Sequence, residues 1–124
     1  MTPIDAITIT VPSDRRYLGV LNLVLGGLGT RLDLPYERVD DLQLAVDSVL
    51  AAGRPAEAEV RLEAEALEDR LLLRLGPLAA GTSVEPGLRR VLEPLVGTAE
   101  RLDRDGREWL SIEVAREPAG ARAE

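Results

Sequence analysis

The chain begins with a short stretch in which apolar and polar residues alternate. Ile7, Ile9 and Val11 are separated by threonines, and Pro12 follows directly. A period of two is typical of a half-buried β-strand, because successive side chains point to opposite faces. The sequence therefore predicts a first strand that ends at Pro12.

Two helical segments follow this strand. Apolar residues recur at helical spacing to about Leu32, and Ser13 stands in the position of an N-cap. A second segment starts after Leu34 and has a broad apolar face as far as Ala52. The predicted apolar face consists of Val39, Leu42, Leu44, Ala45, Val46, Val49 and Leu50. Gly53 and Pro55 are expected to end this second helix.

The first predicted helix contains three glycines near its end, Gly26, Gly27 and Gly29. Each glycine costs a helix about 0.5 to 1 kcal/mol relative to alanine. Close packing against a neighbouring element would explain them, and fraying from Gly26 onward is the alternative.

Two hairpins are predicted in the second half of the chain. Alternation over residues 58–66 leads through a polar turn into a strand over 71–75. A closing hairpin runs over 98–103, turns at 104–106 and returns over 109–115. The core face of its last strand consists of Leu110, Ile112 and Val114.

Between the hairpins, the sequence predicts a loop over residues 76–81 and a short helix that is capped by Ser83 and stops near Pro94. The order is strand, helix, helix, hairpin, helix, hairpin. It predicts an α+β two-layer sandwich, with helices on one face of a mostly antiparallel, mixed sheet. We expect one domain over residues 1–116 and a flexible C-terminal tail over 117–124.

The composition removes several kinds of chemistry. The 124 residues include no His, no Cys and no Lys, and all 15 cations are arginines. A Ser-His-Asp triad, a thiol nucleophile, a Schiff-base lysine, a phosphate-loop lysine and the common zinc sites each need a missing residue type. The sequence therefore leaves carboxylates, hydroxyls and backbone groups as its candidate chemistry.

The charge favours a protein partner or a small ligand over other partners. The formal net charge is -7, and no basic cluster exceeds a pair of arginines. Binding to nucleic acid or to an anionic membrane is therefore disfavoured. No signal peptide and no spanning apolar stretch is recognised, so a cytoplasmic location is expected.

Residues 7–53 carry a recognisable order of features. They read ITITVPSDRRYLGVLNLVLGGLGTRLDLPYERVDDLQLAVDSVLAAG: a strand ending in Val-Pro, a polar cap with an aromatic residue, a Gly-bearing helix and a Leu-x-Leu-Ala-Val-x-x-Val run. This stretch resembles the bacterial anti-sigma factor serine kinases of the RsbW type, in the GHKL (Bergerat fold) ATPase superfamily. The resemblance continues more weakly to about Arg116, and it implies a GHKL ATPase-like fold.

The resemblance also locates a nucleotide site, whose key groups are replaced here. In the family, a glutamate and an asparagine four residues later on the second helix serve catalysis and hold magnesium with the nucleotide. Ser48 and Ala52 occupy these positions. Asp47 is adjacent, but one residue is about 100° around a helix, so it cannot take the glutamate's direction.

Two further family positions are also changed. The aspartate that would bind adenine falls nearest Pro77, and the glycine-rich turn that would face phosphate is reduced to Gly81 and Gly87. The expectation is a degenerate kinase with no catalytic residues, no bound cofactor and no metal.

The resemblance places partner contacts on the first helix. Family members contact a sigma factor and an antagonist there and pair through their sheets, which implies a homodimer or a heterodimer. The family's mid-helix arginine is Asn22 here, and Arg15, Arg16 and Arg31 lie on or beside the same helix. These four are candidate partner-binding residues, and the alternative for the arginines is a solubilising surface role.

Trp109 is a further candidate contact residue. The alternation places it opposite the core face of its strand, together with Leu72. Tryptophan is enriched in interface hot spots. Cover by a terminal segment, or stacking with Arg74, is the alternative.

Together these observations favour a non-catalytic, anti-sigma-factor-like regulatory domain that binds a protein. The first alternative is a divergent ATP-binding serine kinase anti-sigma factor with weak residual nucleotide binding. A structural partner domain of a larger signalling system is the second.

Overall fold

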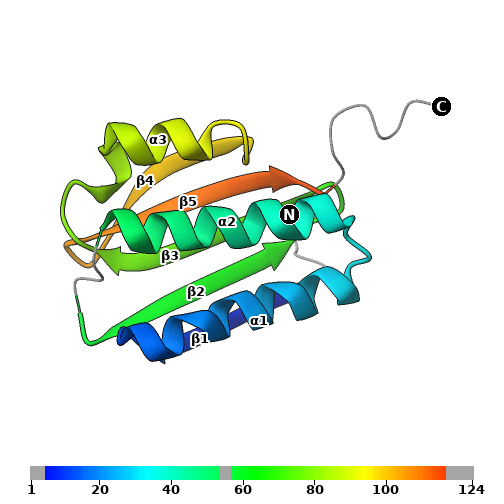
Figure 1. The fold of residues 1–124 in the computed structure, drawn as a ribbon, viewed down its shortest axis with the longest axis horizontal. Helices are drawn as coiled ribbons and strands as arrows, with labels where there is room; N and C mark the ends of the chain where they lie inside the picture. Colours follow the sequence, from blue (N-terminus) through cyan, green and yellow to red (C-terminus); the bar gives the residue numbers. More distant parts are fainter. Residues whose placement is uncertain (1–4, 54–56, 117–124) are drawn as a thin grey trace.

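The computed structural model describes residues 5–53 and 57–116, and it places three α-helices on one face of a five-stranded sheet (Figure 1). The elements are β1 (Asp5–Pro12), α1 (Arg15–Arg31), α2 (Tyr36–Ala52), β2 (Glu59–Ala66), β3 (Arg70–Leu78), the 3-10 turn η1 (Thr82–Val84), α3 (Pro86–Leu92), β4 (Thr98–Arg104) and β5 (Arg107–Ala115). The predicted α+β class is confirmed. The predicted C-terminal tail and Pro55 lie outside the described residues.

The strand order is β1-β2-β3-β5-β4, and every described neighbouring pair is antiparallel. The expectation of a mixed sheet is therefore wrong. The segment through α3 carries the chain past the place of β5 to the edge strand β4, and a tight turn then brings β5 back antiparallel to β3. The two consecutive helices α1 and α2 likewise return the chain so that β2 pairs antiparallel with β1.

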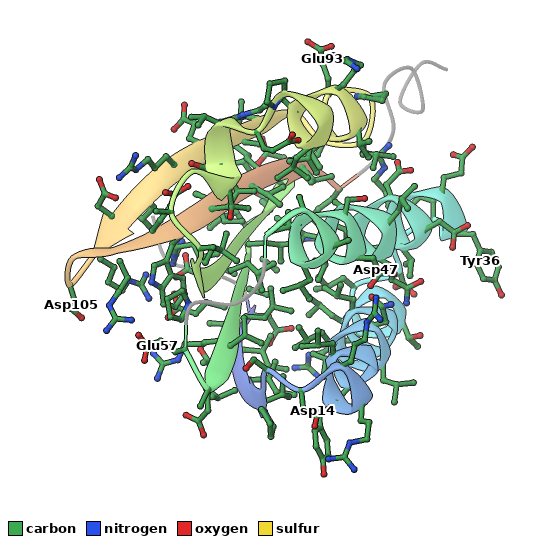
Figure 2. All side chains as sticks on the ribbon, turned by 60° about the vertical axis from the view of Figure 1, so that its left-hand side comes forward. Asp14, Tyr36, Asp47, Glu57, Glu93 and Asp105 are labelled. Atoms are coloured by element: carbon green, nitrogen blue, oxygen red, sulfur yellow. The ribbon has the colours of Figure 1, made fainter. Side chains whose placement is uncertain are left out.

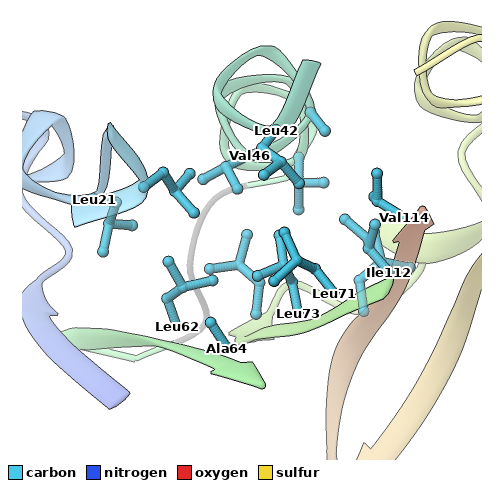
Figure 3. Close-up of a cluster of buried hydrophobic side chains, with 14 of the residues drawn as sticks. Leu21, Leu42, Val46, Leu62, Ala64, Leu71, Leu73, Ile112 and Val114 are labelled. Carbon is cyan, nitrogen blue, oxygen red and sulfur yellow. The ribbon is translucent and has the colours of Figure 1, made fainter. Parts of the chain in front are cut away.

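The core lies between the sheet and the helices (Figure 3). α2 contacts both α1 and α3. The predicted core faces of the strands are confirmed by the burial of Val60, Leu62, Ala64, Ala66, Leu71, Leu73, Leu75, Leu110, Ile112 and Val114. The helices contribute Leu21, Leu25, Leu28, Leu42, Ala45, Val46 and Val49. Leu44, which we expected on the apolar face of α2, is instead 51% exposed.

The N-cap of α1 is Asp14, not Ser13. The Asp14 carboxylate accepts a hydrogen bond from the backbone N–H of Arg16 at 2.9 Å. The Ser13 hydroxyl instead donates to the backbone carbonyl of Glu57 at 2.9 Å. Ser13 therefore joins the start of α1 to the segment before β2, and the neighbouring carboxylate satisfies the helix terminus.

The glycines of α1 do not fray the helix, which continues to Arg31. Gly29 is buried, and a Cβ atom there would lie 2.5 Å from Cγ2 of Val39 on α2. The predicted close packing is confirmed at Gly29, whereas a Cβ on Gly27 would meet no neighbour within 4 Å.

The segment after residue 75 differs from the predicted loop. Gly76 and Pro77 belong to β3, joined by a cis peptide bond, and the pairing with β5 shifts between Leu75 and Leu78. The N-cap of α3 is Glu85, which accepts from the N–H of Leu88 at 2.8 Å. Ser83, the predicted cap, is instead fully buried in η1, and its hydroxyl donates to Glu108 of β5 at 2.6 Å.

One arginine fixes the end of β5 to three backbone carbonyls. Arg116 donates to the carbonyls of Leu67 at 2.9 Å and Glu68 at 3.3 Å in the β2–β3 turn. It also donates to the carbonyl of Leu32, the C-cap residue of α1, at 3.2 Å. The last described residue thus links both layers of the fold.

Candidate functional site

The positions that correspond to the family's catalytic pair lie on α2. Ser48 and Ala52 are one helical turn apart, so they share a side of the helix. The Ser48 hydroxyl donates to the carbonyl of Leu44 at 2.7 Å, within its own helix. Ala52 is the last residue of α2 and offers no polar group. Neither side chain carries the carboxylate or the amide that the resemblance assigns to these positions.

Pro77 lies in β3 and lines a shallow groove together with Arg61 and Trp109, two residues of the sheet face opposite the helices. Ser48 and Ala52 therefore lie on α2, whereas Pro77 lies in β3 beside the groove that Trp109 also lines. Pro77 has no side-chain donor or acceptor for an adenine.

The end of α2 is packed directly against η1. A Cβ atom on Gly53, the C-cap residue, would overlap the Oγ1 atom of Thr82. Thr82 itself is buried, and its hydroxyl donates to the carbonyl of Ala79 at 2.6 Å. The absence of a side chain at Gly53 thus allows the loop after β3 to close against the helix.

A carboxylate that the motif analysis missed, Glu108 of β5, binds the same loop. Its Oε1 accepts from the N–H of Gly81 at 2.9 Å. Its Oε2 accepts from the N–H of Ser83 at 2.8 Å and from the hydroxyl of Ser83 at 2.6 Å. The sequence did hold a signal, because Glu108 is in phase with the buried Leu110 and therefore falls on the core face.

The environment of Glu108 keeps it ionised. Burial opposes its charge, but hydrogen bonds from the Ser83 hydroxyl, the Ser83 N–H and the Gly81 N–H, with the nearby Arg101, outweigh that effect. The pKa of Glu108 therefore lies below its ordinary value. The donors of the loop after β3 therefore bind a negative charge from within the chain, the carboxylate of Glu108.

These residues do not fit a magnesium nucleotide. Magnesium prefers carboxylate and phosphate oxygens, and the position to which the resemblance assigns a metal ligand is an alanine, Ala52. The N–H groups of Gly81 and Ser83, which could face a phosphate, already donate to Glu108. We therefore derive no catalytic step through a nucleotide.

The arginines predicted to bind a partner occupy two ends of α1. Arg15 and Arg16 begin the helix and Arg31 ends it, about 22 Å away at 1.5 Å per residue. Arg16 pairs with Asp14 at 2.9 Å, and Arg31 pairs with Asp5 at 2.6 Å. Within residues 5–53 and 57–116, Arg15 forms no such ion pair.

Asn22 is engaged inside the helical layer. Its Nδ2 donates to both carboxylate oxygens of Asp47 at 3.1 Å, and its backbone carbonyl accepts from Nε2 of Gln43 at 2.9 Å. Figure 2 shows Asp47 on the part of α2 that lies beside α1. Asn22 therefore joins the two helices, and its availability to a partner stays a prediction.

Trp109 is on the sheet face opposite the helices, as expected, but it is not uncovered. The side chain is only 6% exposed. The guanidinium of Arg104 lies 4.2 Å from the ring centroid, so the stacking partner is Arg104 and not Arg74. The ring also rests on Gly76, where a Cβ would lie 2.6 Å from its Cδ2 atom. The role of Trp109 in partner binding stays untested.

The charges around Trp109 are paired with one another. Arg104 reaches Glu63 of β2 at 2.7 Å, and Arg74 binds Glu63 at 3.2 Å and Glu65 at 2.6 Å. The hydrogen bond from Arg104 is the main cause that holds the pKa of Glu63 below its ordinary value.

The described residues form an α+β domain with helices on one face of an antiparallel sheet, and Ser48 and Ala52 stand where the resemblance places the nucleotide-binding pair. No protein-family model matches the chain. Curated proteins do match, and each is named serine-protein kinase RsbW. The match in Bacillus velezensis is 29% identical over 76 residues, which cover 56% of this chain and 48% of that protein.

The corresponding protein of Bacillus subtilis is 30% identical over 73 residues, 54% of this chain and 46% of that protein. The Listeria innocua protein is 28% identical over 92 residues, which cover 69% of this chain and 57% of that protein. Over these stretches the chain is similar to proteins named serine-protein kinase RsbW, as the resemblance of residues 7–53 indicated. It spans about half the length of the curated relatives it matches.

No helix in the described part of the chain is long and apolar enough to cross a membrane. The cytoplasmic location stays a prediction.

Proposed function

We propose that the chain is a non-catalytic, anti-sigma-factor-like regulatory domain that binds a protein, a sigma factor or its antagonist, through the outer surface of α1 and α2. The observation that carries the binding role is the exposure of two large apolar side chains there. Leu23 of α1 is 76% exposed and Leu44 of α2 is 51% exposed. Both point away from the core that the other faces of these helices build.

The surroundings of the two leucines suit a protein contact. Arg16 and Leu23 lie on the same side of α1, seven residues apart, and Arg15 precedes them. An apolar centre with a polar rim is the usual anatomy of a protein interface. Arginines form bidentate contacts with carboxylates, so acidic groups on the partner are expected opposite them.

The non-catalytic part of the proposal is supported by the positions at the end of α2. Ser48 and Ala52 carry neither a carboxylate nor an amide, and the loop donors are bound to Glu108. Catalysis by positioning needs the whole constellation at once. A homodimer, or pairing with an intact relative, is compatible with this role.

Partner binding is tested with purified sigma factors and antagonist-like proteins of the source organism. Leu23→Glu is expected to weaken the binding of the recognised protein by about tenfold or more, because it places a charge in the apolar centre. Val84→Glu is the matched control, since Val84 is 61% exposed but belongs to η1 and not to α1 or α2. Equal effects of the two substitutions, with unchanged circular dichroism spectra, would move the binding site elsewhere.

The loss of catalysis is tested by calorimetric titration with ATP and ADP in the presence of magnesium. The wild-type chain is expected to bind weakly or not at all. Ser48→Glu combined with Ala52→Asn is expected to give no phosphate transfer, because the adenine contact and the free loop donors are still missing. Micromolar, magnesium-dependent binding would instead support the divergent kinase.

A further inference from the structure

Glu108 is unusual because its charge is buried. Its side chain is only 4% exposed, at the start of a strand whose same-face residues are the core residues Leu110 and Ile112. An ionised carboxylate is costly to bury unless hydrogen bonds satisfy it. The partners of Glu108 must therefore supply a specific compensation.

That compensation comes from one three-residue segment of the loop after β3. The N–H of Gly81, the N–H of Ser83 and the hydroxyl of Ser83 converge on the two carboxylate oxygens at 2.6 to 2.9 Å. Arg101 contributes less, because its Nη1 is 4.0 Å away and its side chain pairs with Asp103 at 3.0 Å. The loop, not an ion pair, holds Glu108.

The same segment closes the end of α2. Thr82 lies between the two residues that bind Glu108, and its side chain occupies the space that a Cβ on Gly53 would need. Binding of Glu108 therefore fixes three elements together: β5, the loop after β3 and the end of α2. In this arrangement the loop's donors are turned to an acceptor within the chain.

We propose that Glu108 is an internal anion that occupies these donors, holds the loop closed against α2 and keeps external anions out. The contact excludes an external anion, because the N–H and O–H groups that it occupies are the ones an anionic ligand would need. This role of Glu108 rests on the proposed loss of nucleotide binding. It can be disproved while the proposed partner binding through α1 and α2 still holds.

The first test measures amide hydrogen exchange by NMR in the wild type and in Glu108→Gln. The variant keeps the shape of the side chain but replaces one acceptor oxygen with a donor. Exchange at Gly81 and Ser83 is expected to accelerate by about tenfold or more, with exchange at Leu73 in the core unchanged. Unchanged exchange at Gly81 and Ser83 would overturn the proposal.

The second test asks whether an external anion can replace the carboxylate. In Glu108→Ala, sodium acetate is expected to raise the melting temperature by several degrees more than sodium chloride of equal ionic strength, as expected for a ligand of the native state. Glu113→Ala is the matched control, because Glu113 lies on the same strand but is 44% exposed and pairs with Arg70 at 3.2 Å.

An equal response to acetate in Glu108→Ala, Glu113→Ala and the wild type would overturn the proposal, since the donors would then not form an anion receptor.

If Glu108→Ala does not fold, Ser83→Ala serves instead. It removes only the hydroxyl donor and is expected to accelerate exchange at Gly81 with the core amides unchanged. Exchange at Gly81 in Ser83→Ala that is as slow as in the wild type would then contradict the proposal that Glu108 holds the loop closed.

Discussion

Replacing Trp109 with alanine should destabilise the fold rather than only weaken a contact. The ring is 6% exposed, rests on Gly76 and is covered by Arg104. A buried tryptophan removes about 200 Å² from water, and about 25 cal/mol per Å² sets an upper limit of about 5 kcal/mol. Arg104 can relax into part of the vacated space, so we expect a loss of about 3 kcal/mol in the free energy of unfolding.

Urea denaturation followed by far-UV circular dichroism measures this loss. Trp109 is the only tryptophan of the chain, so its fluorescence cannot be used for the variant. Trp109→Phe is the control, because it keeps an aromatic face beneath Arg104 and is expected to recover more than half of the loss. The reasoning would be refuted if Trp109→Ala cost less than about 1 kcal/mol, as an exposed residue would.

Three other outcomes follow from contacts described above. Gly53→Ala is expected to lose about 1 to 3 kcal/mol of stability by urea denaturation, and the added substitution Thr82→Ala should recover part of it, because the new Cβ then has space. Glu63, whose pKa is lowered mainly by Arg104, stabilises the fold fully above its ordinary pKa of about 4.3, and this contribution is lost as pH falls through the lowered folded pKa. The stability difference between the wild type and Glu63→Gln should therefore shrink in acid titrations followed by thermal melting; a constant difference would contradict it. Asn22→Ala should cost about 1 kcal/mol by removing the donors to the carboxylate on the facing helix, and a loss within error would show that this hydrogen bond contributes nothing.

Much of the fold could be predicted because periodicity reports burial. The alternation in β2 and β5 identified their core faces, since one residue of register moves every side chain to the other face. Periodicity could not predict that β5, and not β4, pairs with β3. That pairing depends on the path of the chain through α3. The same limit explains the mixed sheet that was expected and the antiparallel one that is found.

The candidate site was harder to predict because its contacts join distant residues. The carboxylate of Glu108 and its donors at Gly81 and Ser83 are more than 20 residues apart in sequence. The loop after β3 contains no carboxylate of its own between Gly76 and Ser83. The carboxylate that binds the loop belongs to Glu108 on β5. Only the alternation that puts Glu108 on the same face as the core residues of β5 indicated that it is buried.

The three carbonyl contacts of Arg116 have a practical consequence for anyone who shortens or tags this chain. A C-terminal truncation that keeps Arg116 retains the hydrogen bonds to Leu32, Leu67 and Glu68, whereas one that stops at Ala115 removes them together. Those bonds tie the C-cap of α1 and the β2–β3 turn to the end of the sheet. Expression boundaries and fusion points therefore belong after this arginine, and deletion up to that point leaves every described hydrogen bond in place.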